Sequence, residues 1–249
     1  MDTEAPFRLL SFNIQAGLQT HDYRHYVSGA WRYALPTRRR RDNLLAMAKL
    51  MRGYDFVAIQ EADAGSIRTD RVNLVEFLAE QAGFTHYGLT VTRDLAPFAR
   101  ICLGYLSRTP PTQVITHTLP GRLPGRGALE VDIDSLSLGA LTLLVTHLAL
   151  GRESRVRQLT YLSSVMQGQQ GVLVGDLNGS PESLRRIPGL RTAGLQPLLH
   201  APATYPSWRP RRSLDQVLLT PELQVVSAQA LPVVLSDHLP LAVELARRT

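Results

Sequence analysis

The chain has 249 residues, enough for one large α/β domain, and its content of 44% hydrophobic and 19% charged residues is ordinary for a globular protein. Cys102 is the only cysteine, which excludes an intramolecular disulfide and a multi-cysteine zinc site. The formal net charge of +6 and the pI of about 9.9 favour an anionic partner, although a codon bias toward arginine would give the same charge.

The sequence lacks the usual signals for export or membrane insertion. Residues 1–6 are acidic and have neither the basic start nor the apolar core of a secretory signal. No apolar run approaches the roughly 18–20 residues that span a bilayer. We therefore expect a cytoplasmic protein. Since no linker or shift in composition divides the chain, we also expect a single domain over residues 1–249.

The first elements in chain order are a strand, a long loop and a helix. Alternating, β-rich residues predict a strand over Phe7–Ile14. Residues 15–36 show no period and are rich in His, Tyr and Trp, which predicts a long loop that is either functional or an ordered flap. Thr37 is predicted to cap a helix that runs to Met51. Arginines at positions 38–41 fall in its first turn, where the helix dipole disfavours cations, and indicate either an anionic partner or a solvated basic face.

The following segments repeat this order of strand and helix. A short apolar strand over Asp55–Glu61 ends in an acid, and a helix from about Asp70 to Gln81 follows with Val72 on its apolar face. A second amphipathic helix is predicted over Arg152–Gln167. Further strands are predicted at Phe84–Val91, Ile101–Ser107, Gln113–His117, Ala128–Leu136, Leu141–Leu148, Leu214–Leu219, Gln224–Ala230 and Leu239–Leu245. The repeated order predicts an α/β fold of two similar layers packed face to face, with helices outside.

The segment around which the chain is organised is Gly171–Ser180. Its run of Val and Leu between glycines predicts a buried strand, and Asp176 and Asn178 come at the strand's exit. In an extended chain residues two apart point to the same side, so we expect the carboxylate and the amide to face one spot. Such a pair suits a hard metal ion, an attacking water or a phosphate oxygen. The alternative is an ordinary Asp/Asn turn after a strand.

Several other predicted strands also end in polar residues that a core strand does not need. They are Asn13, Glu61, Thr146-His147, Asp215 and Ser236-Asp237-His238. Ligands gather at strand ends in open α/β architectures, so we expect these side chains to form one site. Acids, amides and histidines together suit metal-assisted phosphoryl transfer, because Mg²⁺ prefers oxygen ligands and shares a phosphate oxygen. Arg122 and Arg126, in the Pro- and Gly-rich loop Leu119–Gly127, are candidates for binding substrate phosphate.

With these residues in order, the chain resembles the endonuclease/exonuclease/phosphatase superfamily, which includes DNase I-like nucleases, sphingomyelinases and inositol phosphatases. The resemblance extends from Leu9 to Leu241. It rests on Ser11-Phe12-Asn13-Ile14, Gln60-Glu61, Thr146-His147-Leu148, Gly175-Asp176-Leu177-Asn178, Leu214-Asp215-Gln216-Val217 and Ser236-Asp237-His238-Leu239-Pro240.

The resemblance implies a DNase I-like fold and a metal cofactor. The fold would be a two-sheet α/β sandwich with helices packed outside two mixed β-sheets and the site at one end of the sheets. The cofactor would be Mg²⁺ or Mn²⁺, held with the help of Asn13, Glu61 and Asp237.

The resemblance also implies roles for the remaining site residues. Asp176 would position and deprotonate the attacking water, and Asn178 would orient that water or the phosphate. His238, oriented by Asp215, and His147 would contact the scissile phosphate and stabilise the transition state.

We therefore expect a metal-dependent phosphodiesterase, with nucleic acid as the first substrate class because a basic protein attracts a polyanion. One alternative is action on a lipid headgroup or a small phosphate ester. A membrane contact would be made by the aromatic loop that contains Tyr23, Tyr26, Trp31 and Tyr33. The other alternative is a non-catalytic binding or scaffold protein on the same fold.

Overall fold

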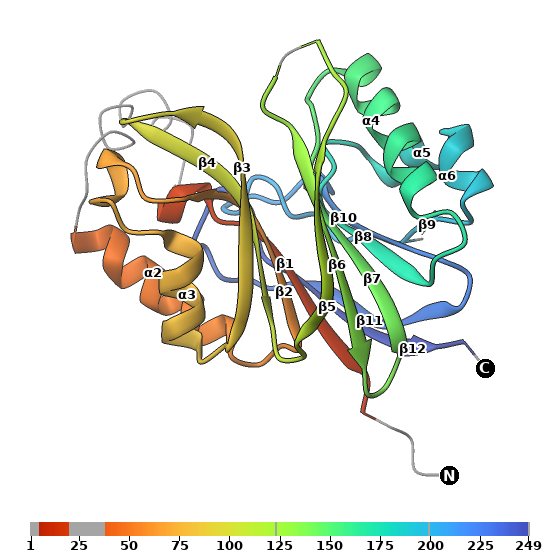
Figure 1. The fold of residues 1–249 in the computed structure, drawn as a ribbon, viewed down its shortest axis with the longest axis horizontal. Coiled ribbons are helices and arrows are strands. Elements are labelled where there is room, and N and C mark those ends of the chain that lie inside the picture. The colour runs from red at the N-terminus through yellow and green to blue at the C-terminus, as the bar shows by residue number, and fades with distance from the viewer. Residues whose placement is uncertain (1–4, 20–37, 123, 199, 249) are drawn as a thin grey trace.

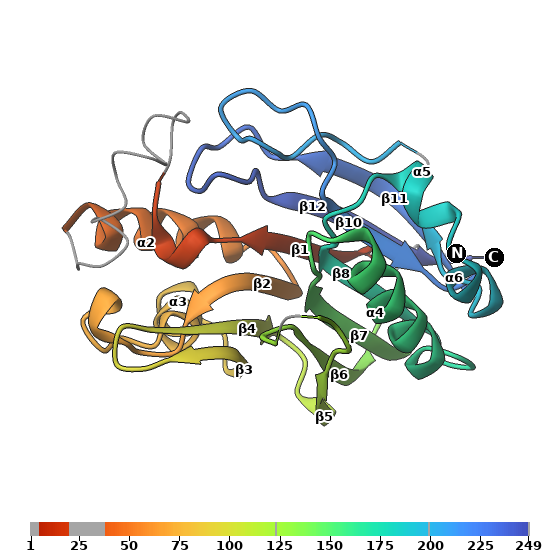
Figure 2. The same cartoon turned by 90° about the horizontal axis from the view of Figure 1, so that it is seen from above.

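Two β-sheets pack face to face in the computed structural model, and helices cover their outer faces (Figures 1 and 2). The structure describes residues 5–19, 38–122, 124–198 and 200–248. Within these residues each sheet has six strands, and each combines one parallel pair with antiparallel neighbours. This arrangement confirms the predicted α/β sandwich with two mixed sheets.

The first sheet has the order β11-β12-β1-β2-β4-β3. Its strands are β1 (Phe7–Asn13), β2 (Phe56–Asp63), β3 (His86–Leu95), β4 (Ala99–Ser107), β11 (Leu223–Ala230) and β12 (Leu241–Arg247). The central strands β1 and β2 run parallel, and the other pairs are antiparallel. The carboxyl ends of β1 and β2 therefore lie at the same edge of the sheet.

The second sheet has the order β5-β6-β7-β8-β10-β9. Its strands are β5 (Pro111–Thr118), β6 (Gly127–Ser135), β7 (Gly139–His147), β8 (Gly171–Asp176), β9 (Gln196–Pro197) and β10 (Asp215–Leu219). Here β7 and β8 are the parallel pair, and the other pairs are antiparallel. The two sheets thus place corresponding parallel pairs at their centres.

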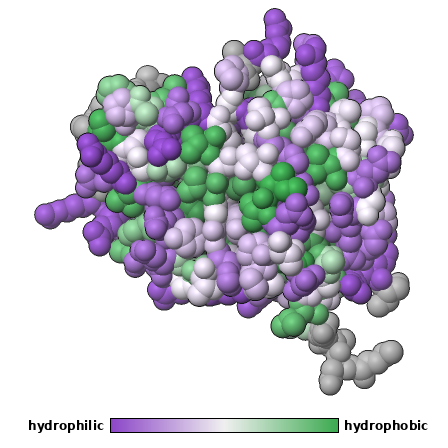
Figure 3. All heavy atoms as spheres, in the orientation of Figure 1, coloured by the Kyte–Doolittle hydropathy of each residue, from purple (hydrophilic) through white to green (hydrophobic). Residues whose placement is uncertain are grey.

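Helices cover each sheet on the side away from its partner. The first sheet carries α2 (Arg38–Met51) and α3 (Leu74–Ala82), and the second carries α4 (Arg152–Val165), α5 (Pro181–Arg185) and α6 (Pro188–Thr192) (Figure 1). Short 3₁₀ turns form at Gln15–Gly17 and Ile67–Thr69. Within the described residues no helix is long and apolar enough to cross a bilayer. On the face drawn in Figure 3, hydrophobic side chains gather near the middle and hydrophilic ones surround them.

The core explains why the central strands are apolar almost throughout. On β1, Leu9 packs into the layer between the sheets, whereas Leu10 and Phe12 pack against the helices outside. On β8, Val172 and Val174 face the inner layer and Leu173 faces the outer one. Because both faces of these strands are buried, their sequences read as continuous apolar runs rather than alternating ones.

The start of α3 differs from the prediction. Asp70 and Arg71 adopt left-handed φ values of 55° and 59°, which a right-handed helix cannot contain. The helix begins at Leu74 instead, where the side chain of Asn73 accepts hydrogen bonds from the N–H groups of the first turn. Val72 therefore lies outside the helix and is 39% exposed, so its predicted place on the apolar face is wrong.

The four consecutive arginines do not form a uniformly solvated face. Arg40 is buried, and its guanidinium donates to the backbone carbonyl of Arg68. Burial first, and then the charge of Arg68, lower the pKa of Arg40 to about 10. The predicted cap Thr37 and the aromatic residues of the predicted loop at 20–36 lie outside the described residues.

Candidate active site

The parallel pairs of the two sheets bring most of the predicted site residues together. Asn13 ends β1, and Glu61 lies near the end of β2. In the other sheet His147 ends β7 directly beside Asp176 at the end of β8, and Asp215 begins β10 opposite Asp176. Asp237 and His238 come from the segment just before β12. Seven residues that are far apart in the sequence thus meet at one end of the sandwich.

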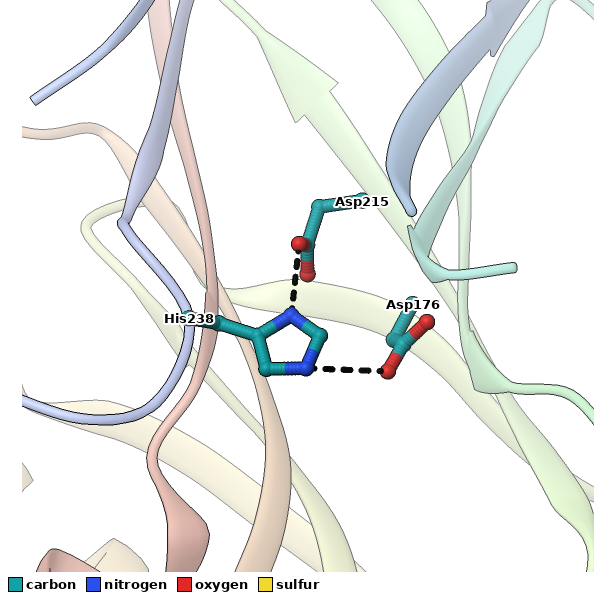
Figure 4. Close-up of side chains that lie close together, drawn as sticks. All are labelled: Asp176, Asp215 and His238. Atoms are coloured by element: carbon teal, nitrogen blue, oxygen red, sulfur yellow. Dashed lines mark hydrogen bonds and ion pairs between the residues drawn. The ribbon is translucent and has the colours of Figure 1, made fainter. Parts of the chain in front are cut away.

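A hydrogen-bonded Asp–His pair lies at the centre of this site. The Nδ1 of His238 lies 2.8 Å from Oδ2 of Asp215, and its Nε2 lies 3.7 Å from Oδ2 of Asp176 (Figure 4). Asp215 also accepts a hydrogen bond from the hydroxyl of Thr204, and the ring of Tyr205 packs 4.9 Å from that of His238. These contacts fix the orientation of the imidazole.

The charge of His238 follows from its neighbours. Burial alone would lower the pKa of this histidine, but Asp215, through its charge and its hydrogen bond, raises it to about 10 with further help from Asp176. The result is an imidazolium whose Nε2 is directed toward Asp176 (Figure 4).

Asp176 is buried, and besides His238 three other groups of the site lie against its carboxylate. Asn13 donates its side-chain amide to Oδ2 at 3.3 Å, Nε2 of His147 lies 3.5 Å from the same oxygen, and the backbone N–H of Asn178 donates to Oδ1 at 3.0 Å. Burial raises the pKa of Asp176; His238 opposes this shift and the charge of Asp215 adds to it. A carboxylate whose proton affinity is raised in this way suits a general base.

His147 stands between two acids. Its Nδ1 lies 3.7 Å from Oε1 of Glu61 and its Nε2 faces Asp176. Burial, and then the charges of Arg126 and His238, lower its pKa well below the usual value. His147 is therefore a neutral imidazole, in contrast to His238.

Glu61 occupies a strained position at the mouth of the site. The pairing of β2 with β4 shifts between Ile59 and Ala62, and within this bulge Glu61 has a left-handed φ of 55°. The distortion turns its side chain, which is 38% exposed, toward His147. The partial desolvation of this carboxylate by the surrounding site, and then the charge of Asp237, raise the pKa of Glu61. Strain of this kind in a non-glycine residue is typical of functional sites.

The backbone after β8 is a turn, so the extended geometry expected between Asp176 and Asn178 is wrong. The strand ends at Asp176, and Asn178 has a φ of 50°, so the two residues are not two apart along an extended chain. The Asn178 N–H instead closes a turn onto Asp176, and its amide donates to the carbonyl of Leu148 at 2.9 Å. Asp176 and Asn178 therefore form the Asp/Asn turn of the alternative, and this turn lies among the residues of the expected site.

Glycine is required just before Asp176. Gly175 has a φ of 140°, and a Cβ there would lie 1.9 Å from the carbonyl oxygen of Thr146. No side chain fits at that distance, so only glycine lets β8 approach β7 closely enough to set Asp176 beside His147.

The two candidate arginines have different environments. Arg126 donates to the carbonyl of His147 at 3.3 Å; burial lowers its pKa, while the charges of Glu61 and Asp176 oppose that shift. Arg126 thus lies within electrostatic reach of the site. Arg122 is exposed, and among the described residues its side chain makes no hydrogen bond or ion pair with the site.

Sequence reasoning missed the residues that support the site from behind. Thr204 and Tyr205 lie in a proline-broken segment with no periodic pattern to reveal them. Arg155 and Gln158 of α4 hold the loop after His147: Arg155 donates to the carbonyl of Leu150 at 2.9 Å, and Gln158 accepts from the N–H of Ala149 at 2.9 Å. The sequence does show Arg155 and Gln158 three residues apart, on one face of a predicted helix, and this spacing could have indicated their shared role.

The donor set fits a divalent cation. Four carboxylates (Glu61, Asp176, Asp215 and Asp237) outnumber the three cationic side chains whose charges act on them (His238, Arg126 and Arg155). Oδ1 of Asp215 is buried with no hydrogen-bond partner in the described residues. Ligand atoms of Asp176, Asp215 and His238 also lie within 4.8 Å of one another. A divalent ion would offset the charge and satisfy oxygen atoms that the protein leaves unpaired.

The architecture and the buried acid–histidine site define a DNase I-like α/β sandwich. A profile of the Endonuclease/Exonuclease/phosphatase family matches residues 10–238. The chain belongs to this family, which is one of phosphoesterase hydrolases.

Solved structures support the fold. An endonuclease/exonuclease/phosphatase from Beutenbergia cavernae has a TM-score of 0.71 at 20% identity, covering 98% of this chain and 72% of that one. The human Nocturnin catalytic domain with bound sulfate has a TM-score of 0.69 at 18% identity, covering 98% and 95%. A mannosyl-6-phosphatase from Bacteroides thetaiotaomicron has a TM-score of 0.68 at 15% identity, covering 96% and 99%. No curated protein matches the chain.

Proposed function

We propose that the enzyme hydrolyses phosphodiester bonds in nucleic acid with the help of a divalent metal ion. The observation that carries the proposal is the Asp215–His238 pair directed at Asp176 amid an excess of carboxylates. A phosphate group is the substrate that needs both a fixed N–H donor and a metal-binding acid cluster. The net charge of +6 favours a polyanion over a neutral or singly charged ester.

The metal would be Mg²⁺ or Mn²⁺, held by Glu61 and Asp237 with help from Asn13. We favour this set over Asp176, Asp215 and His238 because the imidazolium of His238 has no lone pair to offer a metal ion, and Oδ2 of Asp215 is hydrogen-bonded to it. When bound, the ion supplies charge neutralisation and polarises a phosphoryl oxygen.

The chain's own residues would carry out the proton transfer and the phosphate binding. Asp176, with its raised pKa, accepts a proton from the attacking water. His238 donates from Nε2 to a phosphate oxygen, and Asp215 keeps the ring in place. His147 binds the phosphate beside Asp176, and Arg126 adds positive charge. Asn178 holds the turn that presents Asp176 to the water.

Hydrolysis of a substrate panel tests the proposal. The panel contains supercoiled plasmid, single-stranded DNA, RNA, bis(4-nitrophenyl) phosphate, sphingomyelin and a sugar 6-phosphate, each with Mg²⁺, Mn²⁺ or EDTA. We expect metal-dependent cleavage of a nucleic acid that Asp176→Asn abolishes. Cleavage that EDTA stops but Asp176→Asn leaves intact contradicts the assigned site.

A second candidate is hydrolysis of a small phosphate ester. The similar fold of a mannosyl-6-phosphatase supports it, since the name of that protein describes a phosphatase for a sugar phosphate. Turnover of the sugar phosphate alone, without any nucleic acid cleavage, would favour this second candidate. Turnover of sphingomyelin alone would favour a lipid headgroup.

A further inference from the structure

A polar cavity of about 630 Å³ lies directly beside the reaction centre. Its lining includes Asn178 and the start of α5, Arg155 of α4, and Arg211 and Arg212 of the segment before β10. The helices α4 and α5 lie together at one side of the molecule in both ribbon views (Figures 1 and 2). Asn178 belongs both to the cavity and to the turn that holds Asp176, so the two spaces adjoin.

Arg155 connects the cavity to the catalytic residues. Its Nη1 donates to the carbonyls of Ala149 and Leu150, at 3.3 and 2.9 Å, in the loop that follows His147. The negative charge of Asp176 acts on its guanidinium. Its Nε and Nη2 make no hydrogen bond with the described residues, and its Nε lies 3.3 Å from where a Cβ on Gly179 would be. Two donors of this fixed guanidinium therefore remain for a ligand.

The positive charge in the cavity is not balanced. Burial, and then the charges of Arg152 and Arg212, lower the pKa of Arg155, which shows that like charges converge there. The side chains of Arg211 and Arg212 form no hydrogen bond or ion pair within the described part of the chain; Arg212 only approaches the ring of Tyr205, at 6.0 Å.

The acid in the cavity wall does not offset this charge. Glu182 is the one carboxylate among the described residues that line the cavity. A hydrogen bond with Ser180 lowers its pKa first, and the arginines whose charges act on it are Arg185 and Arg186 rather than those facing the cavity. Arg155, Arg211 and Arg212 thus form a cationic surface that lacks an anion.

We propose that this cavity binds a second phosphate group of the substrate, next to the phosphate that is cleaved. Guanidinium forks pair with phosphate oxygens in two-bond geometry, and three of them converge here. The volume exceeds what one phosphate needs and leaves room for a sugar or base attached to it. The second phosphate would come from the next nucleotide of a strand or from a doubly phosphorylated small ester. The inference rests on the proposed function, because it extends the substrate away from the same reaction centre.

Binding of short nucleotides tests the proposal without relying on turnover. Calorimetry with the Asp176→Asn protein and Mg²⁺ compares the dinucleotide TpT, which has one phosphate, with pTpT and TpTp, which have two. We expect one of the doubly phosphorylated forms to bind about tenfold more tightly than TpT. Equal affinity for all three would overturn the proposal.

Two variants show whether the cavity causes the preference. In the double variant Arg211→Ala/Arg212→Ala we expect the ratio of affinities to fall toward one. Arg209→Ala is the control: it removes one positive charge from the same segment, against two in the double variant, and Arg209 does not line the cavity. A preference that survives the double variant, or that Arg209→Ala removes equally, would overturn the assignment to this cavity.

A competition experiment identifies the source of the second phosphate. It also tests this inference independently of the proposed function. Fructose 1,6-bisphosphate and fructose 6-phosphate compete with pTpT for the same protein. Strong competition by the bisphosphate alone supports the cavity and assigns it to small esters. If the wild type cleaves none of the nucleic acids yet keeps the binding preference, the proposed function fails and the second-phosphate site stands.

Discussion

Two buried aspartates of this protein have opposite surroundings, and the contrast distinguishes a structural carboxylate from one that is available to a ligand. Asp63, at the end of β2, accepts hydrogen bonds from Gly65, Ser66, Arg68, Thr69 and Arg100. Although burial raises its pKa, the hydrogen bond and charge of Arg68 and the other donors lower it overall. Asp176, at the end of β8, has few donors and several neighbouring acids, and its pKa is raised.

The difference shows how one fold uses the same residue type in two ways. A carboxylate whose oxygens are fully paired stabilises the loop around it and has no capacity left for a ligand. A buried carboxylate that is only partly paired costs stability, and it keeps oxygen atoms available for a water, a proton or a metal ion. Asp63 is thus a structural residue only two positions from Glu61, a residue of the site.

The largest expected effect comes from neutralising the poorly paired acid. Asp176→Asn should lower kcat by about 10³-fold, because it removes the proposed proton acceptor. The free energy of unfolding should stay equal or rise, since the change relieves repulsion among buried carboxylates. Kinetics of the cleaved substrate and urea denaturation measure the two quantities. A loss of several kcal/mol of stability would show that Asp176 is mainly structural.

Asp63 should behave in the opposite way. Asp63→Ala leaves Arg68 without its 2.6 Å partner and should lower the free energy of unfolding by about 3 kcal/mol. Asp94→Asn is the control, because its ion pair with Arg100 at 3.5 Å is exposed and should cost less than about 0.5 kcal/mol. The pKa of Asp63 is lower in the folded protein than in the unfolded chain. The stability that Asp63 contributes is therefore fully present above the unfolded-state pKa, and it is lost as the pH falls through the folded-state pKa. An unchanged unfolding midpoint for Asp63→Ala at neutral pH would refute this.

The same contrast shows what could be predicted from sequence. The sequence predicts that Asn13, Glu61, His147, Asp176 and Asp215 meet, because polar residues at the ends of apolar strands are recognisable locally and the sheet topology brings strand ends together. The particular sandwich came from the resemblance to a family rather than from any periodicity. The family match over residues 10–238 confirms that resemblance.

What the sequence did not reveal depends on long-range contacts and on backbone conformation. One of the six hydrogen bonds to Asp63 comes from Arg100, 37 residues away, and nothing near Asp63 predicts that contact. Because Asp70 and Arg71 are left-handed, α3 begins several residues later than predicted. The left-handed Asn178 likewise forms a turn where an extended chain was expected. Local propensity does not forbid a helix or a strand at these positions, so the backbone conformation there is set by contacts that form only in the folded protein.

A smaller effect is expected from the residue that orients His238. Asp215→Asn should lower kcat by about 10²-fold with little change in KM, since the amide keeps the shape but loses the charge that holds the imidazolium. Asp134→Asn, an exposed residue of β6, is the control and should leave both constants unchanged. A loss confined to KM would mean that the pair serves substrate binding alone.

The smallest effect expected is the gain in stability from metal binding. This gain tests directly whether a cation binds the cluster of carboxylates. At ten times the dissociation constant, Mg²⁺ or Mn²⁺ should raise the free energy of unfolding by about 1.4 kcal/mol, because the ion binds the folded acid cluster and not the unfolded chain. Glu61→Gln should reduce this gain, whereas Asp94→Asn, an exposed acid outside the site, should keep it. Thermal denaturation across a metal titration measures the gain. If Glu61→Gln keeps the full gain, the ion is held elsewhere, and Asp176, Asp215 and His238 become the first set to test, because their ligand atoms already lie within 4.8 Å of one another.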